Sequence, residues 1–192
     1  MSRSPTSQTT RWSVPTSKTT RSAATKKKRT STTTRPEPVP VALALGGNVP
    51  GPDGPVERTL ARALQRLEEI LGPLRTASLY RTAAVSPVPQ PDYLNTAVLA
   101  SSSLEPGDLL AICKSLELAA GRRRNVRFGP RPLDIDLLLY GDLQISTPEL
   151  TLPHPRLRER RFVLEPLAEI APDLRVPPDG ARVADLLAAL PP

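Results

Sequence analysis

The sequence predicts an α+β domain with the βαββαβ order of a ferredoxin-like sandwich, extended at its C-terminal end by a hairpin and helices. Two segments, 56–71 and 106–120, carry apolar residues at helical spacing. Strand-like segments lie before, between and after them, so the order is strand, helix, strand, strand, helix, strand. We assign this domain to residues 39–192, which are enough to enclose one core.

Residues 1–38 differ from the rest of the chain in composition. Nine of the 26 Lys and Arg residues precede Glu37, whereas all 19 acidic residues lie from Glu37 onward, so the remainder carries a charge of −2. This segment is rich in Ser, Thr and Pro and has no apolar periodicity. It cannot bury enough surface to offset the entropy of ordering it, so we expect a disordered basic tail.

Three explanations of this tail compete with the view that it is a dispensable disordered segment. An Arg- and Ser-rich, acid-free N-terminus is typical of an organelle transit peptide. The basic cluster at 26–29 is a candidate nucleic-acid contact or nuclear address. A start codon placed too far upstream explains the segment equally. We favour a dispensable tail, because the segment lacks the amphipathic helix that would support an organelle transit peptide and the paired motif that would support a nuclear address.

Cysteine content and hydropathy indicate the compartment. The single cysteine, Cys113, excludes an intramolecular disulfide framework and fits a reducing compartment. No apolar run reaches the length of a membrane span, and the N-terminus lacks the apolar core of a signal peptide. We therefore expect a soluble cytoplasmic protein without a membrane partner.

The first half of the domain contains a strand, a helix and a second strand. Residues 39–45 form a short apolar run suited to a central strand, and Gly46 and Gly47 after it allow a tight turn and a close backbone approach. The helix at 56–71 ends at Gly72-Pro73. A strand is expected from about 76 to 84, followed by a Pro-rich loop at 86–91.

The second half begins with a strand at 93–100, which places Tyr93 and Asn95 on the same face. The next helix begins at about 106 and has Cys113 on its apolar stripe, so a buried thiol is expected there instead of a nucleophile. After the strand that contains Asp134, we expect a hairpin around 141–151, a helix at about 162–170 and weak helical character at 183–190.

Asp134 and Asp136 lie one residue apart and therefore share one face of a strand. Two like charges side by side are unfavourable unless a cation lies between them, and Mg²⁺ held by carboxylates and substrate phosphates satisfies this need. Arginines upstream can bind phosphate oxygens bidentately. On this stretch alone, an exposed strand end with a solvated basic loop explains the residues equally well. The arginines are Arg122, Arg123, Arg124, Arg127 and Arg131, and the opposite, buried face holds Leu133, Ile135, Leu137 and Leu139.

Six separated motifs connect these elements with a known family. They read LALGGN, SLYRTAAV, PDYLNTAV, ELAAGR, RFGPRPLDIDLLLYG and LPHPRLRERRFVLEPLAEIAP. From residue 41 to about 174 the chain resembles the 6-hydroxymethyl-7,8-dihydropterin pyrophosphokinases of folate biosynthesis. The resemblance implies a ferredoxin-like fold, a monomeric protein and pyrophosphoryl transfer from Mg·ATP to the pterin hydroxymethyl group, with release of AMP.

The resemblance also implies roles for single residues. It assigns two Mg²⁺ ions to Asp134 and Asp136, which with Arg122 and Arg131 form the catalytic set. For ATP it implies contacts by Glu117, Arg122, Arg131, Thr151, His154 and Arg160. For the pterin it implies that Tyr93 and Phe162 stack on the two faces of the ring and that Asn95 forms hydrogen bonds with the edge of the ring. Thr82 and Asn48 complete this pocket. Aromatic faces and a side-chain amide suit a flat heterocycle with donors and acceptors on its rim.

Plainer interpretations and departures from the family pattern remain. Core packing explains Tyr93 and Phe162, and a structural hydrogen bond explains His154. Lys114 and Glu149 occupy places where some members have a Gln and an Arg that face ATP, and the arginine loop is about one residue short. A nucleic-acid-binding module and a non-catalytic relative are the competing functions. Both are disfavoured by the aligned acids, because binding to a phosphate backbone requires cations.

Overall fold

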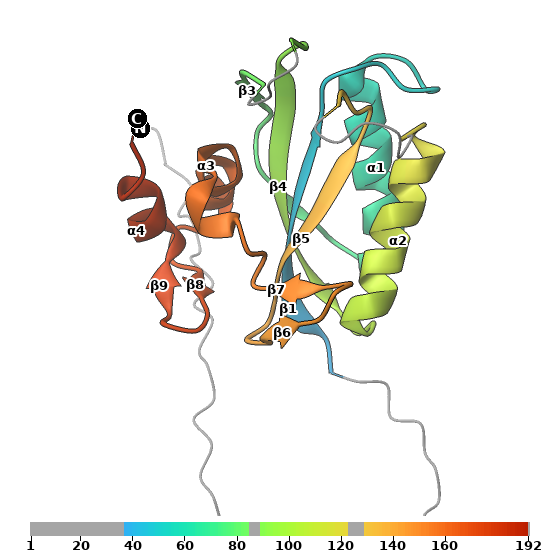
Figure 1. Cartoon of the computed structure of the whole chain (residues 1–192). Coiled ribbons are helices and arrows are strands. Elements are labelled where there is room, and N and C mark those ends of the chain that lie inside the picture. The colour runs from blue at the N-terminus through green and yellow to red at the C-terminus, as the bar shows by residue number, and fades with distance from the viewer. Residues whose placement is uncertain (1–36, 85–88, 123–128, 192) are drawn as a thin grey trace, which may run out of the picture. The chain divides into compact units, whose positions relative to one another are not determined.

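An antiparallel sheet with helices on both faces forms the core of the protein (Figure 1). The computed structural model describes residues 37–84, 89–122 and 129–191, so the predicted tail falls almost wholly outside the described residues. Strand β1 lies between β4 and β5, and the short strands β2 and β3 both pair with β4. The strands are β1 Val39–Gly47, β2 Arg75–Thr76, β3 Tyr80–Thr82, β4 Tyr93–Ser102 and β5 Asp134–Tyr140.

Two helices cover one face of the sheet. Helix α1 (Val56–Leu71) has the expected bounds and ends at Gly72, whose φ of 81° favours glycine. Helix α2 (Pro106–Ala119) begins with proline, which is preorganised for a first helical turn. Their apolar stripes pack against the sheet, and Cys113 is fully buried there, where burial raises the pKa of its thiol to about 12. The prediction of a buried thiol is confirmed.

The opposite face is covered by α3 (Arg161–Ile170), which packs together with α4 (Val183–Ala188). Along the chain between β5 and α3, a hairpin of β6 (Ile145–Ser146) and β7 (Thr151–Leu152) confirms the one expected near 141–151. A 3₁₀ turn (η1, Leu157–Glu159) leads into α3. A second small hairpin, β8 (Arg175–Val176) with β9 (Ala181–Arg182), was not predicted. Among the described residues, none of the helices is both long and apolar enough to span a membrane.

The prediction of one continuous strand from 76 to 84 is wrong, because this segment forms two short strands, β2 and β3. Thr76 pairs with Val98 and Tyr80 with Asn95, so three residues oppose two on β4. This bulge turns Ser78 out of the ladder, where its N–H and hydroxyl donate to the Glu169 carboxylate of α3. Helix α3 is thereby joined to the sheet.

A second bulge, in β5, changes which face of the sheet the side chains after Leu137 occupy. Ala42 pairs with Leu139 and Leu43 with Leu137, which leaves Leu138 as the extra residue. Leu139 consequently packs in the α3 core, and the prediction that it shares a face with Leu137 is wrong. The bulge lies beyond Asp136, so the alternation of Asp134 and Asp136 with buried Ile135 is preserved.

Candidate active site

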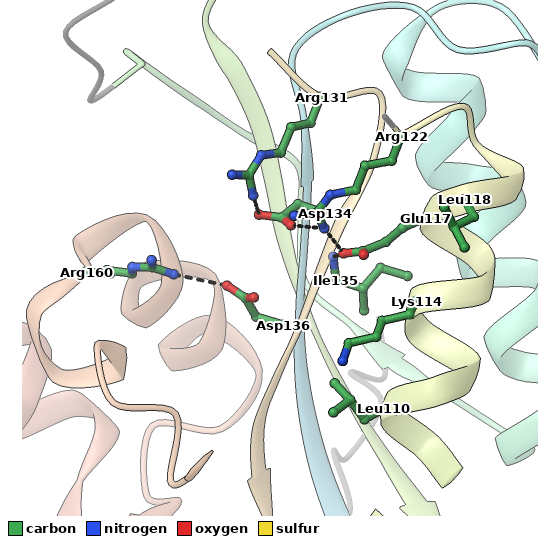
Figure 2. Close-up of a pocket in the computed structure, with 10 residues that line it drawn as sticks. All are labelled: Leu110, Lys114, Glu117, Leu118, Arg122, Arg131, Asp134, Ile135, Asp136 and Arg160. Carbon is green, nitrogen blue, oxygen red and sulfur yellow. Dashed lines mark hydrogen bonds and ion pairs between the residues drawn. The ribbon is translucent and has the colours of Figure 1, made fainter. Parts of the chain in front are cut away.

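A pocket of about 310 Å³ lies along β5 between α2 and α3 (Figure 2). Because β5 is an outer strand of the sheet, its free edge faces this pocket. Six predicted site residues line it together: Glu117, Arg122, Arg131, Asp134, Asp136 and Arg160. The remaining lining residues are Leu110, Lys114, Leu118 and Ile135.

The two aspartates are half-buried and paired with arginines. Asp134 accepts from Arg122 Nη1 at 2.6 Å through Oδ1 and from Arg131 Nη1 at 2.8 Å through Oδ2. Asp136 Oδ2 accepts from Arg160 Nη1 at 3.0 Å. Arg122 lies three residues after α2, Arg131 shortly before β5 and Arg160 directly before α3, so the carboxylates of β5 are tied to the segments that follow α2 and precede α3.

Glu117 connects α2 to the edge of β5. Its carboxylate accepts from Ile135 N at 2.7 Å, which satisfies an edge N–H that has no strand partner, and it also forms an ion pair with Arg122. Burial raises the pKa of Glu117 to about 7, and Asp134 adds to the rise, although the Ile135 N–H and Arg122 oppose it. This carboxyl group therefore titrates near neutral pH.

We expect Glu117→Gln to change how stability depends on pH. The pKa of Glu117 lies above its ordinary value of 4.5, so its stabilising effect is complete below about pH 4.5 and is lost as pH rises through about 7. Gln keeps the acceptor for Ile135 N but does not titrate. By pH 8 the variant should therefore gain on the order of 3 kcal/mol over the wild type relative to pH 4.5. Urea unfolding of both proteins across this range measures the difference; parallel curves would contradict it.

His154 lies beside Asp136, with Nε2 3.8 Å from Asp136 Oδ2. Its Nδ1 accepts from the Arg156 N–H at 3.1 Å, which leaves the proton of a neutral imidazole on Nε2. Burial lowers the pKa of His154, and Arg160 and Arg156 lower it further against the opposing effect of Asp136. At neutral pH, His154 therefore presents an uncharged N–H donor towards the aspartates.

The residues predicted for the pterin do not line this pocket. Asn95 is buried and donates to Thr82 Oγ1 at 2.8 Å, so β4 and β3 place these two predicted residues together. Tyr93 is partly buried, and this burial raises the pKa of its hydroxyl. Phe162 packs beside the α3 core, with the Arg160 guanidinium 5.5 Å from its ring centroid. Arg160 thus contacts both the aspartate pocket and a predicted stacking residue.

Asn48 holds three segments together. Its backbone N–H donates to Arg131 O at 2.9 Å, and its Oδ1 accepts from Arg131 N at 2.8 Å. Its Nδ2 donates to Gln90 Oε1 at 2.8 Å and Pro91 O at 3.1 Å. The amide of this buried side chain is therefore engaged within the protein, and it fixes the backbone from which Arg131 reaches Asp134.

A second, mainly apolar hollow of about 490 Å³ adjoins the first between the start of α2 and the β6–β7 hairpin. Leu110 and Lys114 line both. Thr151 belongs to β7 of the same hairpin but lines neither hollow. The predicted residues Arg123, Arg124 and Arg127 lie outside the described residues.

The sequence matches the profile of the 7,8-dihydro-6-hydroxymethylpterin-pyrophosphokinase (HPPK) family over residues 42–172. The chain belongs to the HPPK family. It is 44% identical over 147 residues to the 2-amino-4-hydroxy-6-hydroxymethyldihydropteridine pyrophosphokinase of Synechocystis, covering 76% of this chain and 73% of the relative. The Pseudomonas aeruginosa protein of the same name is 40% identical over 151 residues, or 79% of this chain and 91% of its own.

HPPK domains also share the fold. The crystal structure of wild-type Plasmodium falciparum HPPK-DHPS superposes with a TM-score of 0.60 at 15% sequence identity. The match covers 79% of this chain but only 41% of that longer chain. At this identity the likeness establishes the architecture, a mixture of helices and antiparallel sheet.

Sequence reasoning did not identify every pocket residue of this HPPK chain. Leu110 and Leu118 lie on α2 and were not predicted as site residues. Lys114 was noted only as a departure from the family pattern. Its position, three residues before Glu117 on the same helix face, is the signal that places it at the pocket.

Proposed function

We propose that this protein transfers the pyrophosphoryl group of ATP to the hydroxymethyl group of 6-hydroxymethyl-7,8-dihydropterin, giving the pterin diphosphate and AMP for folate biosynthesis. Membership of the HPPK family supports the reaction class. The single observation that carries the proposal is the pair Asp134 and Asp136, aligned on one strand face and surrounded by arginines in one pocket.

The donor set fits Mg²⁺. Asp134 and Asp136 offer half-buried carboxylate oxygens, and no group of three or more His, Cys, Asp or Glu side chains in the described ranges forms a closed metal cage. Mg²⁺ prefers this arrangement, in which one or two carboxylates hold the ion and substrate phosphates complete its coordination. When bound, two such ions would neutralise the charge of the phosphates during transfer.

The residues of the chain position the reactants. Arg122, Arg131 and Arg160 neutralise the aspartates in the structure, and the same fork-shaped guanidinium groups bind phosphate oxygens bidentately. His154 donates Nε2–H to a phosphate without adding charge. Phosphoryl transfer depends mainly on position and charge neutralisation, so no strong general base is required.

The two substrates are proposed to approach from different sides. The apolar hollow beside the β6–β7 hairpin suits the nucleoside of ATP. Glu117, which lines the adjoining charged pocket, and Thr151, on β7 of the hairpin, are further proposed contacts of ATP. The pterin ring is proposed to stack between Tyr93 and Phe162, with its edge hydrogen-bonded by Asn95 and Thr82. Asn48 completes that pocket through the backbone that it holds in place.

AMP production from ATP tests the function. We expect AMP only when both the pterin and Mg²⁺ are present. AMP formed without the pterin, or no AMP at all while ATP binds, would refute the transfer and favour a non-catalytic ligand-binding protein. Binding of the full chain to nucleic acid instead of ATP would favour the remaining competing function.

The domain organisation is proposed together with the function. We propose a ferredoxin-like sandwich, supported by the antiparallel strand order in which β2 and β3 occupy the place of one strand beside β4, followed by β1 and β5. A monomer and a cytoplasmic location are further proposals, the second supported by the single cysteine.

We expect that deletion of residues 1–37 leaves catalysis intact. Every predicted site residue lies at or beyond Asn48, and the deleted segment has no pattern that could contribute to the core. Steady-state rates of the truncated and full-length proteins provide the measurement. A tenfold loss, equivalent to about 1.4 kcal/mol of activation free energy, would show that the tail takes part.

A further inference from the structure

Glu169, near the end of α3, accepts hydrogen bonds from β3 and from the bulge that precedes it. Its Oε2 lies 3.0 Å from both Ser78 N and the Tyr80 hydroxyl, and its Oε1 lies 2.9 Å from Ser78 Oγ. Donation by Ser78 lowers the pKa of the Glu169 carboxyl group, and the bond to Glu169 raises the pKa of the Tyr80 hydroxyl. At neutral pH the carboxylate is therefore charged and the phenol remains its donor. We call this set of hydrogen bonds the Glu169 contact.

Helix α3 depends on such contacts for its place on the sheet. It has ten residues, and Pro166 within it removes the hydrogen bond that would join position 166 to Phe162 O. In addition to its apolar packing, the start of the helix is fixed by Arg160, which pairs with Asp136 of β5. The Glu169 contact fixes the other end, so it helps to determine where α3 lies relative to β3.

The strand held by the Glu169 contact carries one side of the proposed pterin site. Tyr80 and Thr82 point to the same side of β3 and lie opposite Asn95 and Tyr93 of β4. Because the Tyr80 hydroxyl reaches α3, this side of the sheet is the one that faces α3. Thr82, two residues beyond Tyr80, accepts from Asn95 Nδ2 at 2.8 Å. The contact therefore holds the strand on which Thr82 meets Asn95.

The other side of the proposed pterin site belongs to α3 itself. Phe162 precedes Glu169 by seven residues, so the two side chains lie on the same face of α3, about 10 Å apart along its axis. A ring stacked between Phe162 and Tyr93 requires a constant gap between this face of the helix and β4. The Glu169 contact joins the same helix face to β3, which pairs with β4.

We infer that Glu169 is a positioning residue for the pterin: by binding Ser78 and Tyr80 it holds β3 against α3 and sets the gap between Thr82 and Phe162. This inference rests on the proposed function, in which these residues bind the pterin. Glu169 acts through β3 and not through contact with the substrate. A pocket whose two sides are already spaced for the ring loses less binding free energy to ordering, so the effect of Glu169 should fall on pterin affinity.

Steady-state kinetics of Glu169→Ala and Glu169→Gln test the contact. We expect Glu169→Ala to raise the KM for the pterin about fivefold, because several hydrogen bonds to a charged group are lost together, whereas kcat and the KM for ATP should change little. Gln keeps an oxygen that accepts from Ser78, and its amide N–H can donate to the Tyr80 oxygen, so Glu169→Gln should stay close to the wild type. Glu68→Ala, which removes an exposed carboxylate from α1 on the opposite face of the sheet, is the matched control.

Tyr80→Phe tests the same contact from the side of the sheet. It removes one donor to Glu169 and keeps the aromatic ring, so we expect the KM for the pterin to rise about twofold. Combined with Glu169→Ala it should add nothing further, because the hydroxyl has already lost its acceptor. Effects that multiply in the double variant would overturn the inference. A Tyr80→Phe protein with the wild-type KM would do so as well, even if Glu169→Ala failed to fold.

The outcomes separate the inference from the function it rests on. If the wild type makes AMP and Glu169→Ala matches Glu68→Ala, the role of Glu169 is refuted while the proposed function stands. Equal losses in Glu169→Ala and Glu169→Gln would also refute it, because hydrogen bonding would not be the cause. A lower kcat with an unchanged KM for the pterin would show only a loss of folded enzyme and would likewise refute positioning. If the wild type makes no AMP, the proposed function itself fails.

Discussion

Asp134→Asn and Asp136→Asn should each lower kcat by roughly 10²–10³ at saturating Mg·ATP and pterin, a loss typical of removing one electrostatic contact to a transition state. Asn preserves the size of the side chain and the strand, but it removes the charge with which each residue is proposed to hold Mg²⁺. Pterin binding without nucleotide should change far less, because Tyr93, Asn95 and Phe162 are proposed to carry it.

Stability separates this result from a purely structural role for the pair. The ion pairs of Asp134 and Asp136 are half-exposed, and such pairs contribute about 0–1 kcal/mol each. Loss of repulsion between Asp134 and the neighbouring Glu117 offsets part of this change. We therefore expect the metal-free melting temperature to change little in either variant.

The control for the aspartates is Asp179→Asn, which removes an exposed aspartate paired with Arg158 away from the pocket. It should leave kcat unchanged. A variant of Asp134 or Asp136 that is strongly destabilised without metal, yet nearly as active as the wild type, would refute the metal assignment and show that the pair only stabilises the fold.

The helices could be predicted from the sequence because their signals are local. The apolar spacing of α1 and its terminal Gly72 give both of its bounds. The bulge in β5 could not be located, since the run Leu137-Leu138-Leu139 is apolar at every position and allows either face for each residue. The β8–β9 hairpin did carry a turn signal, Asp179-Gly180, but its two-residue strands are too short for an alternating pattern.

The charged residues of the site were easier to predict than the contacts that hold their backbone in place. Asp134 and Asp136 stand out because two acids alternate with apolar residues, and the structure places six predicted residues around one pocket. The contacts of Asn48 depend on three segments that are distant in sequence, so no local pattern indicates that its amide is used internally.

The second large effect is expected from substitution of Gly46, which lies opposite Asn95 in the register of β1 and β4. A Cβ at position 46 would lie 2.4 Å from Asn95 Oδ1. Asn95 is buried and bonded to Thr82 Oγ1, so its amide cannot move aside without losing that hydrogen bond. The glycine therefore fixes the orientation of the side chain proposed to bind the pterin edge.

Gly46→Ala should accordingly destabilise the fold by about 1–3 kcal/mol, as overpacking does, and raise the KM for the pterin at least tenfold. Gly107→Ala on α2 is the stability control: an added Cβ there meets nothing within 4 Å, so it should raise the melting temperature slightly. A double-mutant cycle identifies the cause. If the collision with Asn95 is responsible, Gly46→Ala should cost much less in an Asn95→Ala background, measured by urea unfolding. Equal losses in both backgrounds would show that the alanine disturbs β1 itself and not the pterin-binding amide.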